Sequence, residues 1–135
     1  MVAMLGENRI RRKVGEAVAR AVEPGETVRA TVYLHTYGSA TPAIVLGGLP
    51  VNLRTSIVAL TDRRVLIFDG DETNASNSRL IAAYPRAAVS VDAENRPDRP
   101  THLTLTFSDD GTRRFAVPNI WRKDAAAFVA DLNSG

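Results

Sequence analysis

The first segment of the chain has the spacing of an amphipathic helix. Charged side chains occupy one arc of this segment, and apolar residues occupy the other. Between Glu7 and Val22 the apolar residues recur at three- and four-residue steps, at Ile10, Val14, Ala17, Val18 and Ala21. Pro24 and Gly25 follow, and both disfavour continuation of a helix. We therefore predict an N-terminal amphipathic helix and linker, residues 1–25, ahead of a separate unit, residues 26–135.

From Glu26 onward, short runs of β-branched and aromatic residues alternate with polar ones between turn residues, which is typical of β-strands. Seven strands are predicted, at Thr27–Thr36, Arg54–Thr61, Arg64–Asp69, Arg79–Tyr84, Ala87–Asp92, Thr101–Ser108 and Thr112–Val117. Helical spacing returns afterwards, with Asn119 as the expected N-cap and an inward face of Trp121, Ala125, Phe128 and Leu132. A helix this short is unstable alone, so we expect it to dock over an open end of the barrel that the strands form.

The hairpin around Asp62 and Arg63 has two apolar faces. Pairing Leu60 with Val65 places one apolar pair on one face, and pairing Ile57 with Phe68 places another on the opposite face. Both faces need cover, because an exposed apolar face of this extent favours association. We expect the barrel interior on one face and either the N-terminal helix or a second subunit on the other.

The last hairpin allows its register to be tested. A two-residue turn would mix core and solvent faces, and this register is rejected. A three-residue loop, Asp109–Gly111, with glycine in the left-handed position, pairs Leu105 with Phe115 and Leu103 with Val117. This register keeps one face apolar and the other polar.

The connection between the first two strands, Tyr37–Leu53, is long, apolar and without any basic residue. Its glycines and prolines exclude a transmembrane helix. Long loops are often functional, so its tip is a candidate for insertion into a membrane interface or a partner's groove. Alternatively, it folds back over the barrel or extends the flanking strands. The candidate interaction surface, taken with the two-faced hairpin, is Ile44, Val45, Leu46, Leu49, Val51, Ile57 and Phe68.

Composition and charge narrow the function classes. The chain has 135 residues, no cysteine, and 17 basic against 15 acidic residues, so neither disulfides nor a strong polyanion partner is implied. The cluster Arg9, Arg11, Arg12 and Lys13 is a candidate contact for anionic lipid, the alternative being an ordinary solvated helix face. No nucleic-acid motif is present. The first residues do not form a secretion signal, so we expect a cytoplasmic protein.

Candidate chemistry is sparse. His35 and His102 have no metal-ligand spacing, and the segment from Asp69 lacks the glycine and the glutamate of a calcium loop, with Asn74 and Leu80 in their places. That segment is predicted to be a solvated loop running through Ser78. The serines show no nucleophile motif, and no glycine-rich phosphate loop occurs. We therefore predict no catalytic residues, no metal and no cofactor.

Three strings resemble bacterial pleckstrin-homology-like (PH-like) and GRAM-like domains: "VALTDRRVLIFDG" (58–70), "YPRAAVSVD" (84–92) and "LTLTFSDDGTRRFAVP" (103–118). The resemblance covers residues 26–133. It implies a mainly β fold with helices: a seven-stranded antiparallel barrel capped by a C-terminal helix that carries an inward tryptophan. It also implies a scaffold without catalysis that binds lipid headgroups, peptides or other subunits, and bacterial members often self-associate.

Phosphoinositide binding is not expected, since such members place basic residues in the loop after the first strand, and this loop has none. We therefore expect a non-catalytic module that binds a protein partner or self-associates through the apolar loop and hairpin. The alternative is a peripheral membrane-binding domain that uses the 42–53 loop and the basic N-terminal helix. Nothing in the sequence favours an apolar ligand held inside the barrel.

Overall fold

The structure, a computed structural model, describes residues 2–37, 45–46, 49–50, 53–71, 74–94, 101–108 and 111–134. Two α-helices, α1 (Val2–Ala21) and α2 (Arg122–Ser134), flank the strands in the chain order. The strands are β1 (Val28–Tyr37), β2 (Val45–Leu46), β3 (Leu49–Pro50), β4 (Leu53–Thr61), β5 (Arg64–Asp69), β6 (Arg79–Pro85), β7 (Val89–Glu94), β8 (Thr101–Phe107) and β9 (Gly111–Val117). Three short 3-10 helices are η1 (Ala75–Asn77), η2 (Arg86–Ala88) and η3 (Asn119–Trp121).

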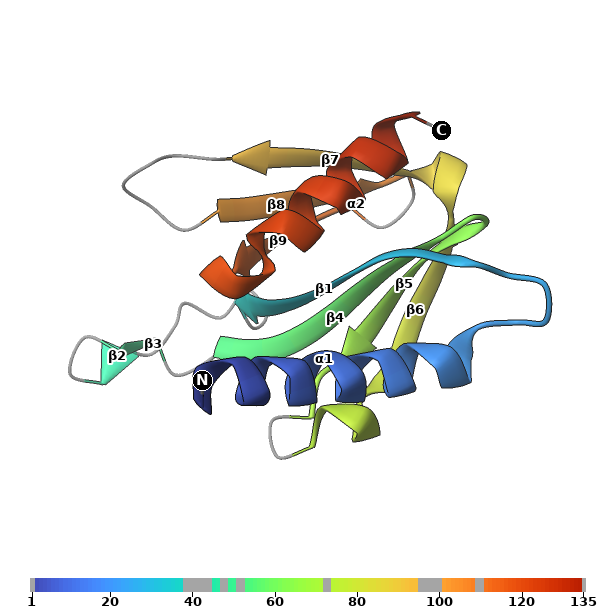
Figure 1. The fold of residues 1–135 in the computed structure, drawn as a ribbon. Helices are drawn as coiled ribbons and strands as arrows, with labels where there is room; N and C mark the ends of the chain where they lie inside the picture. Colours follow the sequence, from blue (N-terminus) through green and yellow to red (C-terminus); the bar gives the residue numbers. More distant parts are fainter. Residues whose placement is uncertain are drawn as a thin grey trace.

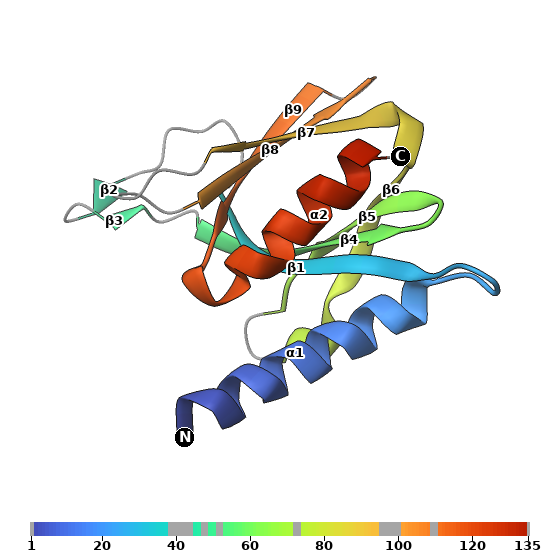
Figure 2. The same ribbon diagram turned by 45° about the horizontal axis from the view of Figure 1, so that its top comes forward.

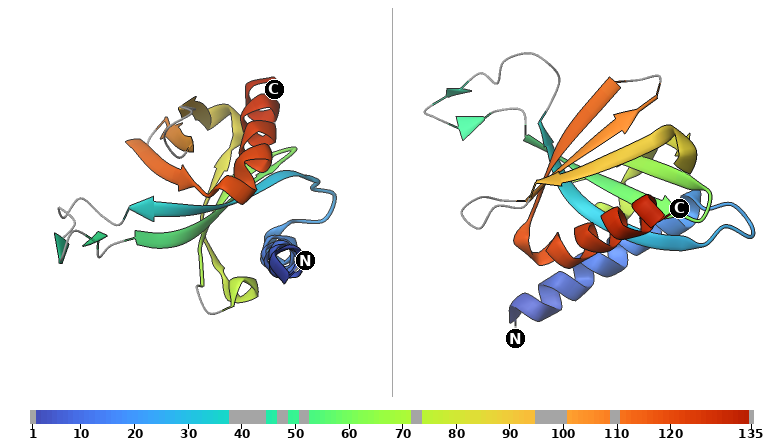
Figure 3. Two further views of the ribbon diagram at one scale, coloured as in Figure 1. Left: turned by 60° about the vertical axis from the view of Figure 1, so that its left-hand side comes forward. Right: turned by 90° about the horizontal axis from the view of Figure 1, so that it is seen from above.

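Seven strands form one antiparallel sheet in the order β6-β5-β4-β1-β9-β8-β7. β1 pairs with β4 along its length but with β9 only at His35 and Thr36, so the sheet bends there into two halves that face each other (Figures 1 and 3). Tyr84 of β6 stacks on Phe107 of β8 across the interior, with ring centroids 4.3 Å apart. The predicted antiparallel fold is confirmed, although the described edge strands β6 and β7 do not pair to close the barrel.

α2 packs against β1 and β7 (Figure 2). Trp121, Ala125, Phe128 and Leu132 are all buried, which confirms the predicted inward face. The layout implied by the resemblance, seven antiparallel strands followed by one helix with an inward tryptophan, is therefore present. The N-cap prediction was wrong, because η3 intervenes: Asn119 is its first residue, and Pro118 precedes it without a side-chain cap.

α1 covers the outer face of the half made by β1, β4, β5 and β6, on the other side of β1 from α2 (Figures 1 and 3). Val14, Ala17 and Val18 are its buried face, as the spacing predicted. In the β4–β5 hairpin Leu60 pairs with Val65 and Ile57 with Phe68, which confirms the predicted register. Both faces of this hairpin are buried within the chain, and α1 is the lid that the second face required.

The register of the β8–β9 hairpin differs from the prediction by two residues. Leu103 pairs with Phe115, and Phe107 remains in the strand opposite Gly111, which has the expected left-handed φ of 81°. Gly111 is therefore the first residue of β9 instead of the last residue of the loop. A shift by two residues preserves the faces, so the predicted separation of core and solvent sides holds.

The segment after β5 is not simply a solvated loop. Residues Ala75–Asn77 form η1, whose Asn74 side chain accepts a hydrogen bond from the backbone N–H of Ser76. Ala75 is buried, and η1 packs against α1, where the Arg20 guanidinium donates to the Ser76 carbonyl. Sequence reasoning recognised that this segment is no calcium loop but missed its role as a support for α1.

Candidate functional site: a groove between the two helices

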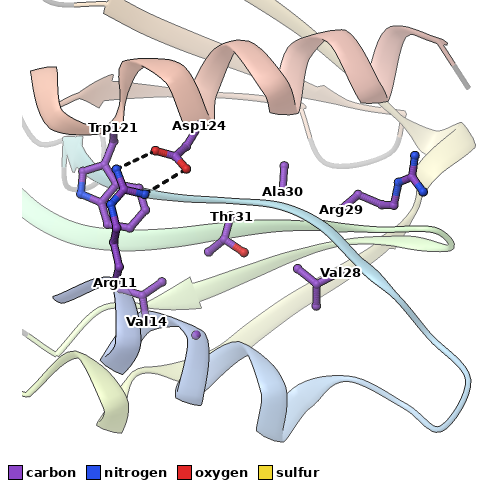
Figure 4. Close-up of a pocket in the computed structure, with 9 residues that line it drawn as sticks. Arg11, Val14, Val28, Arg29, Ala30, Thr31, Trp121 and Asp124 are labelled. Atoms are coloured by element: carbon purple, nitrogen blue, oxygen red, sulfur yellow. Dashed lines mark hydrogen bonds and ion pairs between the residues drawn. The ribbon is translucent and has the colours of Figure 1, made fainter. Parts of the chain in front are cut away.

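A groove of about 310 Å³ lies between α1 and α2, with β1 as its floor (Figure 4). Four consecutive residues of β1, Val28 to Thr31, line it. A bulge separates Val28 from Ala30, but Ala30 and Thr31 then pair in regular register with β4 and so point to opposite faces of the sheet. A cavity that both of them line must lie against the backbone edge of the strand.

At the groove, none of the described strands pairs with this edge of β1. β9 pairs with β1 only further along, at His35 and Thr36. Among the described residues, the segment Val28–Thr31 therefore has a sheet partner on its β4 side alone. An unpaired strand edge is a template for another extended chain.

Arg11 joins the two walls of the groove. Its guanidinium lies 4.3 Å from the centre of the Trp121 ring and forms a two-pronged ion pair with Asp124, both N···O distances being 3.0 Å. It also donates to the carbonyl of Ile120 at 2.8 Å. Cation–π contacts and bidentate pairs hold a guanidinium in one geometry. The wall made by α1 is thus fixed to the wall made by α2.

Gly15 widens the groove on the α1 side. A Cβ added at this position would meet no heavy atom within 4 Å. On the floor, Val28 is 41% exposed although it is apolar. The groove therefore offers open space beside an apolar floor.

A second ion-pair cluster fastens the far end of α2. Asp131 accepts hydrogen bonds from Arg29 of β1 at 3.1 Å and from Arg86 of η2 at 3.2 Å. The hydrogen bond from Arg29, and then that from Arg86, lower the pKa of the Asp131 carboxyl. The carboxylate is therefore committed to holding α2 against β1.

A buried ion pair anchors the end of α1. The Glu26 side chain is fully buried and accepts hydrogen bonds from Arg64 at 2.6 and 2.8 Å and from Thr61 at 2.6 Å. Arg64 also donates to the carbonyl of Ala21, the last residue of α1, at 3.2 Å. The hydrogen bonds from Arg64 lower the pKa of Glu26 to about 2, although burial opposes this shift. This cluster is structural, because its groups are used within the chain.

The residues of the predicted interaction surface lie in different parts of the structure. Ile57 and Phe68 are 0% and 1% exposed, so their assignment to a surface was wrong: α1 covers them. Leu46 and Leu49 pair in the small β2–β3 hairpin with Val45 opposite Pro50, apart from the main sheet (Figure 1). Ile44 and Val51 lie outside the described residues.

The four residues of the predicted basic cluster do not share one surface. Arg9 and Arg12 are exposed and Lys13 is half-buried, as expected for a helix face turned to solvent. Arg11 instead belongs to the groove, so it no longer counts among the candidate lipid contacts. The groove itself was not predicted, and its one local signal is an isolated glycine, Gly15, within a helical pattern.

The two histidines of the chain lie in the sheet and are kept apart by one strand. His35 and His102 both lie opposite Ala116 of β9, which separates them. Within the described residues, no three His, Asp or Glu side chains are placed to share a metal ion. Neither described helix combines the length and apolar character needed to cross a bilayer.

No protein-family model matches this sequence, and no curated protein matches it. Among solved structures, the chain is similar to the crystal structure of a pleckstrin homology domain from Shewanella amazonensis SB2B, with 12% identity and a TM-score of 0.49. The match covers 91% of this chain and 97% of that chain. A likeness at this level says nothing about function. Membership in the PH-like or GRAM-like families stays a prediction.

Proposed function

We propose that this chain is a non-catalytic interaction module that binds a protein partner in the groove between α1 and α2. The supporting observation is a concave site with an apolar floor at Val28 and walls locked together by Arg11 and Trp121. Binding sites are usually concave and largely preformed, with apolar surface and a few placed polar groups. Fixed walls reduce the ordering cost of binding.

The test fills the groove without unfolding the chain. Gly15→Leu places a leucine side chain in open space on α1, and Ala19→Leu places the same side chain at an exposed position one turn further along the helix. Peptides selected on the wild type from a random display library are expected to bind Ala19→Leu unchanged and to lose at least about tenfold in affinity for Gly15→Leu. Equal binding to all three proteins, or no selected peptide, would refute the proposal.

Peripheral membrane attachment is the second candidate function. Its support is that Arg9 and Arg12 are exposed on α1 and that β2 and β3 form a small hairpin apart from the main sheet (Figure 1). Leucines at an interface and basic side chains near anionic headgroups act together. Flotation with anionic vesicles at low and high salt, with Leu46→Asp/Leu49→Asp as the comparison, tests it. Loss of flotation in that variant supports attachment, and absence of flotation by the wild type refutes it.

A further inference from the structure

We infer that the groove takes an extended, acidic segment of a partner protein, which adds as a strand to the free edge of β1. This inference rests on the proposed function and specifies its partner. At the floor of the groove, a strand edge rather than a sheet face meets the cavity. An extended segment satisfies such an edge through its backbone, whereas a helix cannot, because its backbone groups are already used.

The length of the free edge of β1 matches that of a short added strand. The four residues from Val28 to Thr31 extend about 13 Å at about 3.3 Å per residue. Alternate side chains of an added strand point to opposite sides of it, towards α1 on one side and α2 on the other (Figure 4). On the α1 side Gly15 leaves room for such a side chain, and on the α2 side the buried Trp121 ring borders the groove.

The charges at the rim favour an acidic occupant. The two carboxylates on the α2 side are already paired, Asp124 with Arg11 and Asp131 with both Arg29 and Arg86. Besides Asp124, the charged side chains that line the groove are the two arginines Arg11 and Arg29. The lining therefore carries a net positive charge, and complementary charge speeds association and excludes unlike partners.

The probes are three synthetic peptides that differ in one property each. The first is the alternating acidic peptide Glu-Val-Glu-Val-Thr-Val-Glu, the second replaces every glutamate by lysine, and the third is the acidic peptide with every backbone amide nitrogen methylated, so that neither edge can donate. We expect the acidic peptide to bind, and the lysine and methylated peptides to bind at least about tenfold more weakly. In amide NMR spectra of the labelled protein, the acidic peptide should shift and protect the N–H groups of β1 between Val28 and Thr31.

The outcomes separate this inference from the proposed function. Library-selected peptides that lose affinity for Gly15→Leu while the acidic and lysine peptides bind alike would overturn the acidic preference alone. Undiminished binding of the methylated peptide would overturn strand addition. Failure of every peptide, together with vesicle binding that depends on Arg12 and survives Gly15→Leu, would assign the cations to a membrane surface and overturn both proposals.

Discussion

Replacing Glu26 by glutamine removes one buried charge at nearly constant volume. In the native state this carboxylate has its pKa lowered from 4.5 to about 2 by the hydrogen bonds from Arg64. Each pKa unit corresponds to about 1.4 kcal/mol, so at neutral pH the ionised form of Glu26 stabilises the fold by about 3 kcal/mol more than its protonated form would. We expect Glu26→Gln to lower the free energy of unfolding by this amount at pH 7, as is usual when one partner of a buried pair is removed.

The pH dependence gives the sharper test. Because the folded pKa is the lower one, the contribution of Glu26 is complete above its unfolded value of 4.5 and is lost as the pH falls towards about 2. Urea unfolding of both proteins at pH 7 and near pH 2.5 should show a stability difference that shrinks with acidification. A difference below about 1 kcal/mol at pH 7, or one that does not change with pH, would refute the reasoning.

Glu94→Gln is the matched control for this experiment. Glu94 pairs with Arg114 at 3.1 Å, but their side chains are 45% and 54% exposed. Solvent screens such a pair, so this variant should lose less than about 1 kcal/mol. A similar loss in both variants would show that burial of Glu26 is not the cause.

Two glycines should respond in opposite directions, and self-association can be tested separately. Gly15→Ala should raise the free energy of unfolding by about 0.5–1 kcal/mol in urea titrations, since the methyl group meets nothing and a helix favours alanine. Gly70→Ala should lower it by about 1–3 kcal/mol, because its Cβ would lie 2.5–2.8 Å from atoms of Thr55; an unchanged value would contradict this close approach. Leu80 and Ile81 are 41% and 55% exposed on the edge strand β6, so light scattering at micromolar concentration should give a mass above the monomer's that Ile81→Arg reduces. A wild-type monomer would refute self-association.

The elements and one hairpin were predictable because their signals are local. A short connection at Asp62 and Arg63 joins β4 to β5, and it permits one register in which Ile57 faces Phe68. The last hairpin allowed two registers that keep the same faces. They differ in whether Gly111 closes the loop or begins β9, and the structure has it begin β9. A period of two does not distinguish registers that are two residues apart.

The groove depends on contacts between distant parts of the chain. Arg11 and Asp124 are 113 residues apart in the sequence, and neither has a pattern that identifies the other as its partner. Sequence reasoning treated Arg11 as one cation in a basic cluster, because helical spacing defines a polar arc but not what lies beside it. Only the docking of α2 places Trp121 under its guanidinium.

The position of α1 connects the stability of the fold to its proposed binding role. Its apolar face covers Ile57 and Phe68, but an apolar contact alone leaves a helix free to slide along a sheet. Polar contacts restrict α1 at three points. Arg11 pairs with Asp124, Arg20 donates to the Ser76 carbonyl, and the Ala21 carbonyl accepts from Arg64. A wall held at several points keeps a constant width, and a preformed groove binds an extended segment without first paying for its own ordering. The lid that buries the two-faced hairpin is therefore also one wall of the proposed binding site.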